Sequence, residues 1–142
     1  MSTNVLQSKN IKREWHHFDA DGKILGRLAT EVATILMGKK KPSFVPYLDS
    51  GDYVVVTNAS KVKLTGKKMQ TKTYTSHSGY PGGLKVEIFD KMIVRKPVFV
   101  FEHAVAGMLP GNKLGKQMIK KLKVFAGSEH PYAKNIKAVT KE

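Results

Sequence analysis

The sequence predicts an α/β domain, because short strand-like runs alternate with helical patterns along the chain. Residues 53–57 form a compact β-branched run that is typical of a buried strand. A first strand is predicted from Trp15 to Ala20, where the turn signal Asp21-Gly22 ends an aromatic, apolar run. At 142 residues, of which 41% are hydrophobic, the chain is long enough to bury the core of one such domain.

The clearest predicted helix lies between these two strands, at residues 25–36. Leu25, Leu28, Val32 and Leu36 share one face at helical spacing, whereas polar side chains occupy the opposite face. Gly38 follows as a stop signal, because glycine readily adopts the left-handed conformation that ends a helix. We therefore expect an amphipathic helix with one buried face.

Beyond residue 57 the pattern is less regular. Val62 and Leu64 alternate with lysines, which predicts a short, half-buried strand ending at Gly66. Residues 76–83 combine serine, histidine, glycine, tyrosine and proline. This composition predicts a loop between two basic, strand-like segments, because several positions need the freedom of glycine.

The second half begins with a short helical pattern over residues 88–94, which Lys96-Pro97 stops. Pro97 can itself occupy the first position of a following helix. Residues 98–101 alone fit a buried strand equally well. We favour the helix, because Val98, Phe101, Val105 and Met108 share one helical face.

After a break at Pro110-Gly111, a further helical pattern places apolar and basic side chains on opposite faces. The apolar face consists of Leu114, Met118, Ile119 and Leu122. The basic face consists of Lys116, Lys120 and Lys123. Val124 and Phe125 then predict a last strand, and the tail beyond Ala133 shows little periodicity.

The chain is strongly basic, with 25 lysine and arginine residues against 11 acidic ones and a formal net charge of +14. Only Arg13, Arg27 and Arg95 are arginines, which favours neutralisation of phosphates over bidentate reading of bases. Residues 53–86 and 103–128 hold eleven lysines and no acidic residue. Because protein surfaces usually intersperse both signs, these stretches predict a surface for a polyanion, with nucleic acid as the first candidate.

Several classes of site lack their motifs. Without cysteine, the chain has neither disulfides nor thiolate metal sites. Residues 111–117 superficially resemble a phosphate-binding loop, but only three residues separate the glycines and Gln117 stands where Ser or Thr would reach magnesium. The five histidines form no H-E-x-x-H pair, and His16 and His17 would point to opposite faces of one strand. We expect no enzyme activity, metal or cofactor.

Two other function classes compete with nucleic-acid binding as interpretations of the basic charge. A phosphoryl-handling enzyme would need a metal-binding carboxylate cluster, and a peripheral membrane protein would favour Trp at the rim of its lysine helix. The segment Met1 to Lys12 lacks the apolar core of a signal peptide. No stretch approaches the roughly 20 apolar residues that span a bilayer. We therefore expect a soluble, intracellular protein.

Aromatic residues accompany the lysines in the predicted loops, namely Phe44, Tyr47, Tyr74 and Tyr80. Exposed rings can stack on unpaired bases while lysines neutralise phosphates. His77 and His130 lie in similar surroundings, where an imidazole could contact a base or a phosphate. Phe44 and Tyr74 could instead cover the core. The chain has no RRM signature or zinc knuckle, which favours a folded RNA shape over a short single-stranded sequence.

Short motifs follow one another along the chain in a characteristic order. The first half contains Leu25-Gly26-Arg27-Leu28-Ala29, Gly51-Asp52 and Asn58-Ala59. The second half contains Thr65-Gly66-Lys67-Lys68, His77-Ser78-Gly79-Tyr80-Pro81-Gly82-Gly83 and Ala104-Val105-Ala106-Gly107-Met108-Leu109-Pro110. In this order, over about residues 13–131, they resemble the bacterial ribosomal protein L13 family. The end departs from the family pattern, since Tyr132 stands where a second histidine is usual and residues 133–136 lack the usual Ala-Gln-x-Pro.

This resemblance implies a three-layer α/β/α domain around a small, mostly parallel sheet, with basic loops, a short irregular N-terminal extension and a C-terminal tail. Residues 1–142 would form one domain with its core at about 13–131. The resemblance also implies a constituent of the large ribosomal subunit in the cytoplasm, which binds 23S-type ribosomal RNA (rRNA), contacts neighbouring ribosomal proteins and supports early assembly. No membrane or small-molecule substrate is expected.

Charge, aromatic placement and the resemblance together give a set of candidate RNA-contacting residues. The resemblance alone assigns Arg27, Lys39, Lys67, Lys68, His77 and the turn 107–110 to segments that face RNA. The full set is Arg27, Lys39, Lys40, Lys41, Lys67, Lys68, Lys72, Tyr74, His77, Tyr80, Lys113, Lys116, Lys120, Lys123 and His130.

Overall fold

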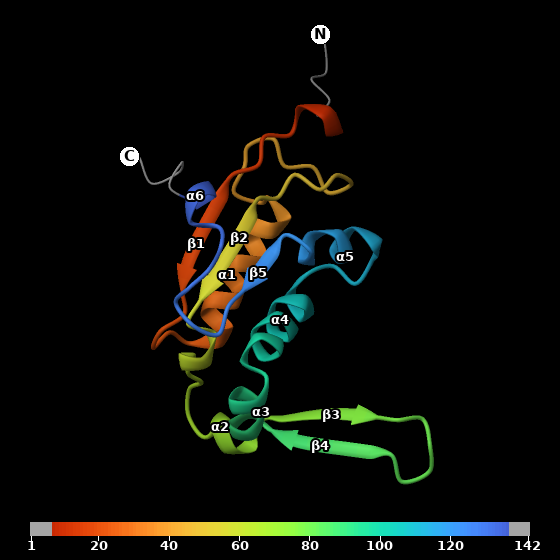
Figure 1. The fold of residues 1–142 in the computed structure, drawn as a ribbon. Coiled ribbons are helices and arrows are strands. Elements are labelled where there is room, and N and C mark those ends of the chain that lie inside the picture. The colour runs from red at the N-terminus through yellow and green to blue at the C-terminus, as the bar shows by residue number, and fades with distance from the viewer. Residues whose placement is uncertain (1–6, 137–142) are drawn as a thin grey trace.

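The computed structural model describes residues 7–136 and confirms the alternation of strands and helices (Figure 1). Strands β1 (Trp15–Asp19), β2 (Tyr53–Thr57) and β5 (Leu122–Val124) form a parallel sheet in the order β1-β2-β5. Trp15 pairs with Tyr53, and Val54 pairs with Leu122, so β2 is the central strand. Its β-branched residues 54–56 are completely buried, as expected for a parallel strand covered on both faces.

Helix α1 (Leu25–Met37) confirms the predicted amphipathic helix. Leu28, Val32 and Leu36 are buried in the core that α1 shares with the sheet and with α4. Gly38 ends the helix with a φ of 79°, a left-handed conformation in which a side chain would be strained. The stop signal in the sequence therefore acts through backbone geometry.

Helices α3 (Phe89–Arg95) and α4 (Pro97–Met108) confirm the helical interpretation of the segment that fitted a strand equally well. Pro97 begins α4, as predicted. Val100, Phe101 and Val105 lie in the core, where α4 packs against α1 and β5. Met108, which helical spacing assigns to the same face, lies at the end of the helix and is 40% exposed.

A hairpin projects from one end of the molecule, beside the short helix α2 (Lys68–Thr71) (Figure 1). Its strands β3 (Thr73–His77) and β4 (Leu84–Ile88) pair antiparallel. The turn 78–83 between them confirms the predicted loop. Gly79 and Gly82 adopt positive φ values of 84° and 71°, which explains why this turn needs glycine.

The strand predicted at residues 62–64 is wrong. Residues Ala59–Lys61 form a 3-10 turn (η2), and the segment after it contributes a single parallel bridge between Ile24 and Lys63. The Lys63 N–H donates to the Lys23 carbonyl, and the Leu25 N–H donates to the Lys63 carbonyl, each at 2.9 Å. Alternation correctly predicted that Val62 is buried, but pairing does not extend past the bridge.

The helix predicted from residue 114 to 122 is too long. Helix α5 (Lys113–Ile119) ends before Leu122, which begins β5. Buried Leu122 and Val124 alternate with half-buried Lys123, which is the two-residue repeat of a strand. Leu122 fits both this repeat and the helical spacing of α5, so spacing alone does not show where the helix ends. The last strand therefore begins two residues before the predicted Val124.

The C-terminal segment covers the face of the sheet opposite α1 and α4. Trp15 stacks on Tyr53 with ring centroids 4.5 Å apart and on Tyr132 at 5.1 Å. Tyr132 leads into helix α6 (Ala133–Ile136), which contacts β1 (Figure 1). At the other end of the described chain, a 3-10 turn (Ser8–Asn10, η1) precedes β1. The three-layer α/β/α arrangement is confirmed, with a thin third layer.

Candidate nucleic-acid interface

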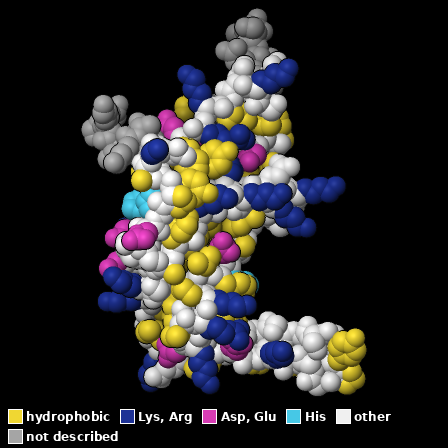
Figure 2. Space-filling model, viewed as in Figure 1, with side chains coloured by type: hydrophobic (Ala, Val, Ile, Leu, Met, Phe, Trp, Pro, Cys, Tyr) yellow, Lys and Arg dark blue, Asp and Glu magenta, His cyan; other side chains and the backbone are white. Residues whose placement is uncertain are grey.

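Exposed lysines flank helix α4 at both of its ends. Lys67, Lys68 and Lys72 lie on or beside α2, which contacts the α3 helix that leads into α4. At the far end of α4, the exposed lysines are Lys113, Lys116 and Lys120. Figure 2 shows basic side chains projecting from the surface at the level of α5. We call these six residues the basic rim.

The sequence around α5 determines which way its lysines point. The Asn112 side chain caps the helix by accepting a hydrogen bond from the Gly115 N–H at 2.9 Å. Gly115 packs against the carbonyl of Pro110, which leaves no room for a side chain there. Met118 is buried on the inner face. Lys113 and Lys116 are therefore held toward solvent by a capped and tightly packed turn.

Lys123 does not share a face with Lys116 and Lys120, contrary to the helical interpretation. It lies in β5 and pairs with Val55, whereas its neighbours Leu122 and Val124 point into the core beneath α4. Successive strand residues point to opposite faces, so Lys123 lies on the sheet face that the C-terminal segment covers. It is half-buried.

Tyr74 is buried, which agrees with the alternative in which its ring covers the core. The ring packs edge-on against Phe99 and His103, with centroids 6.2 and 5.6 Å away, and burial raises the pKa of its hydroxyl. The Lys72 ammonium lies 5.5 Å from the centre of the ring. Tyr74 therefore positions a lysine of the basic rim.

The end of the hairpin carries two of the predicted contact residues. His77 is exposed, and its Nδ1 accepts a hydrogen bond from the Gly79 N–H at 2.9 Å. Tyr80 is 76% exposed, so its ring is free to stack. The hairpin thus presents an aromatic ring away from the body of the domain.

The remaining candidates are scattered. Arg27 is exposed on α1, and Lys39 and Lys40 are exposed just after Gly38. His130 is half-buried and stacks on His17 with centroids 5.4 Å apart. Burial and the neighbouring His130 lower the pKa of His17, which favours the neutral imidazole. These candidate residues lie on α1, in the loop after it and in the C-terminal segment, outside the elements that carry the basic rim.

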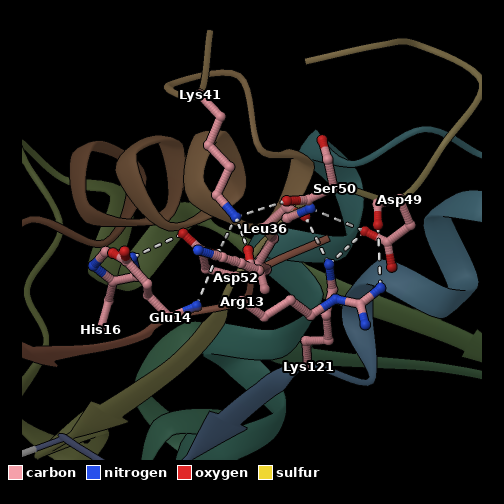
Figure 3. A network of polar contacts seen from close by, with 11 residues as sticks. Arg13, Glu14, His16, Leu36, Lys41, Asp49, Ser50, Asp52 and Lys121 are labelled. Carbon is pink, nitrogen blue, oxygen red and sulfur yellow. Dashed lines mark hydrogen bonds and ion pairs between the residues drawn. The ribbon is translucent and has the colours of Figure 1, made fainter. Parts of the chain in front are cut away.

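A buried polar network, which no sequence motif indicated, lies between the loop after α1 and the start of β5 (Figure 3). Lys121 is only 6% exposed, and its ammonium forms an ion pair with Asp49 and donates to the Leu36 carbonyl at 3.2 Å. Burial lowers the pKa of Lys121, and the Asp49 carboxylate partly opposes that shift. This lysine therefore holds secondary structure together and is not part of an RNA-binding surface.

Lys41 lies at the partly exposed side of the same polar network. Its Nζ lies 2.5 Å from Asp52 Oδ1 and donates to the Ser50 carbonyl at 3.0 Å. Burial raises the pKa of Asp52, but hydrogen bonds from Lys41, the Glu14 N–H and His16 outweigh it and hold the pKa below its usual value. Lys41 thus faces an internal carboxylate, unlike its exposed neighbours Lys39 and Lys40.

One group of side chains in this region has the composition of a metal site. The ligand atoms of Glu14, His16 and Asp52 lie within 4.8 Å of one another. Both Asp52 carboxylate oxygens are already engaged, one by Lys41 and the other by His16 Nε2 at 3.0 Å. A metal ion would have to displace the Lys41 ammonium, so the arrangement is that of a structural ion-pair network.

Among residues 7–136, no helix is long and apolar enough to cross a membrane.

Residues 13–131 match the family described as ribosomal protein L13. Over 131 residues the chain is 54% identical to the large ribosomal subunit protein uL13 of Symbiobacterium thermophilum, with 92% of each chain covered. It is 56% identical over 133 residues to the uL13 of Tolumonas auensis, covering 94% of each. With the uL13 of Dehalococcoides mccartyi it shares 50% identity over 142 residues, which is 100% of this chain and 99% of that relative. The chain therefore belongs to the ribosomal protein L13 family.

Proposed function

We propose that this protein is a structural constituent of the large ribosomal subunit, where it binds 23S-type rRNA and supports early assembly in the cytoplasm. Its relatives in Symbiobacterium thermophilum and Tolumonas auensis carry the name large ribosomal subunit protein. The ribosomal protein L13 family is structural, and the chain is accordingly not an enzyme. The binding of RNA is argued from the surface of the chain itself.

The basic rim is the observation that carries the proposal. Its six lysines are exposed, and none forms an ion pair with a carboxylate of residues 7–136. Lysines without a carboxylate partner can each neutralise an RNA phosphate and release a bound counterion, which is favourable at low salt. Because a lysine acts as a point charge, this surface suits the backbone of a folded RNA better than a base sequence.

The hairpin supports contacts with neighbouring ribosomal proteins. Leu84 and Val86 are 62% and 55% exposed. They lie on one face of the hairpin, because they are two residues apart in β4. An isolated two-stranded hairpin is only marginally stable in water, so this apolar face gains from being covered. An apolar face fits the surface of a protein neighbour better than it fits a row of phosphates.

Sedimentation tests the proposal. We expect the tagged full-length protein to co-sediment with the large subunit in bacterial lysates at low salt and to leave it only at high salt, because the lysine contacts are screened. Depletion of the protein should leave incomplete large-subunit precursors in the gradient. Free protein at the top of the gradient at every salt concentration would contradict the proposal.

A further inference from the structure

A cavity of about 430 Å³ lies between the start of α1, helix α2 and the second half of α4. Apolar side chains, including Leu25, Leu64 and Met108, form much of its wall, and Tyr74 and His103 add ring edges. Lys68 and Lys72 of the basic rim also line it, whereas no acidic residue of the described chain does. Pockets of roughly 300–1,000 Å³ with mostly apolar walls and a few polar groups are typical sites for small organic groups.

Contacts within the described chain do not explain why two positions in this wall are glycine. Gly26 and Gly107 both lie in helices, where glycine is less favourable than alanine. Neither has a positive φ, and a Cβ added at either position would meet nothing within 4 Å. Gly115 in α5 differs, because a Cβ there would overlap the Pro110 backbone. The bare backbone at Gly26 and Gly107 instead leaves room for something outside the chain.

The charge around the cavity indicates what that occupant is. Lys72 is held over the Tyr74 ring, and Lys68 lies one helical turn before it on the same wall. Two ammonium groups beside an apolar pocket suit a ligand that is flat and apolar at one end and anionic at the other. An unpaired nucleotide has this character, since its base is flat and its phosphate is anionic.

We propose that this cavity binds one unpaired nucleotide of the large-subunit rRNA, with the base against Gly26 and Gly107 and the phosphate at Lys68 and Lys72. The proposal rests on the RNA-binding function proposed above and gives it a specific site. The base reaches the wall because neither glycine projects a side chain. An apolar side chain from a protein neighbour would fill the pocket but would leave both lysines without an anion.

Blocking the cavity tests the proposal on the full-length protein. In Gly107→Leu the new side chain occupies the place of the base. We expect its affinity for transcribed large-subunit rRNA to fall by at least about fivefold, the scale of one lost stacked base. Thermal unfolding should occur at the same temperature or a higher one, because leucine favours the helix. Chemical probing should show one unpaired base that the wild-type protein protects and the variant does not.

Matched variants distinguish blocking of the cavity from the effect of an added leucine or a lost charge elsewhere on the surface. Gly127→Leu makes the same change at an exposed glycine with open space around it and away from the cavity, and should bind like the wild type. Lys72→Gln should weaken binding more than Lys91→Gln, which removes an equal charge from the exposed side of α3. If Gly107→Leu unfolds, Gly107→Ala preserves the fold and should give a smaller loss of the same kind.

The outcomes are distinguishable. Wild-type affinity and an unchanged footprint in a folded Gly107 variant would overturn the cavity proposal and leave RNA binding intact. Protection that requires another ribosomal protein, and is absent from the complex with RNA alone, would show that a protein side chain fills the pocket and would also overturn it. Failure of the wild-type protein to bind the rRNA would instead contradict the proposed function.

Discussion

Replacing Lys121 by methionine is expected to lower the free energy of unfolding by about 3–5 kcal/mol, the usual cost of breaking a buried ion pair from one side. Methionine keeps most of the apolar stem but removes the ammonium. The Asp49 carboxylate then loses its cation, and the Leu36 carbonyl loses a donor, at a site where the Lys121 and Asp49 side chains are only 7% and 13% exposed. Urea denaturation followed by circular dichroism measures the difference.

Lys120→Met provides the matched control, because Lys120 is exposed and adjacent in sequence. Its effect should lie within about 0.5 kcal/mol of zero, as for most surface substitutions. Adding Asp49→Asn to Lys121→Met should recover part of the loss, since no unpaired charge then remains buried. Equal stability of the Lys120 and Lys121 variants would show that the network contributes nothing to the fold.

The Phe101→Ala variant should lose about 3–5 kcal/mol of stability, because the side chain is completely buried in the hydrophobic core. The same substitution at Phe99, which is 41% exposed, should cost clearly less. This contrast follows from the helix, which turns residues two apart to different sides. In a strand, Phe99 and Phe101 would share one face. Equal losses at the two positions, measured by denaturant unfolding, would contradict the packing of α4.

Local periodicity alone predicts the type and bounds of an element when the same pattern of burial continues along its whole length. Helix α1 combines a long apolar face with a glycine stop, and β2 is a β-branched run buried on both sides, so the predictions for both lie close to the observed bounds. Residues 62–64 and 114–122 are harder. In both segments the spacing of apolar residues fits a strand or a helix. The length of that element depends on which backbone groups it can hydrogen-bond to, and spacing does not reveal these partners.

The candidate site shows the same limit. The acid-free stretches predicted where exposed lysines would concentrate, and all six lysines of the basic rim lie in them as surface groups. Spacing could not show that Lys121 and Lys41 face internal carboxylates, because their partners Asp49 and Asp52 come from a loop with no regular period. Lys123 was misplaced for a related reason, since its face changes where a helix gives way to a strand.

The proposed function depends most on the binding of RNA phosphates by the basic rim, and the salt dependence of rRNA binding tests this most directly. The triple variant Lys113→Gln, Lys116→Gln and Lys120→Gln removes one half of the rim. Its slope of log affinity against log salt should be shallower than that of the wild type by roughly 0.7–0.9 for each phosphate that a lysine no longer neutralises. A control triple variant, Lys23→Gln, Lys91→Gln and Lys134→Gln, removes the same charge from other exposed positions and should keep the wild-type slope. If the α5 variant also keeps the wild-type slope, these lysines are merely solvated and the proposed RNA face is wrong.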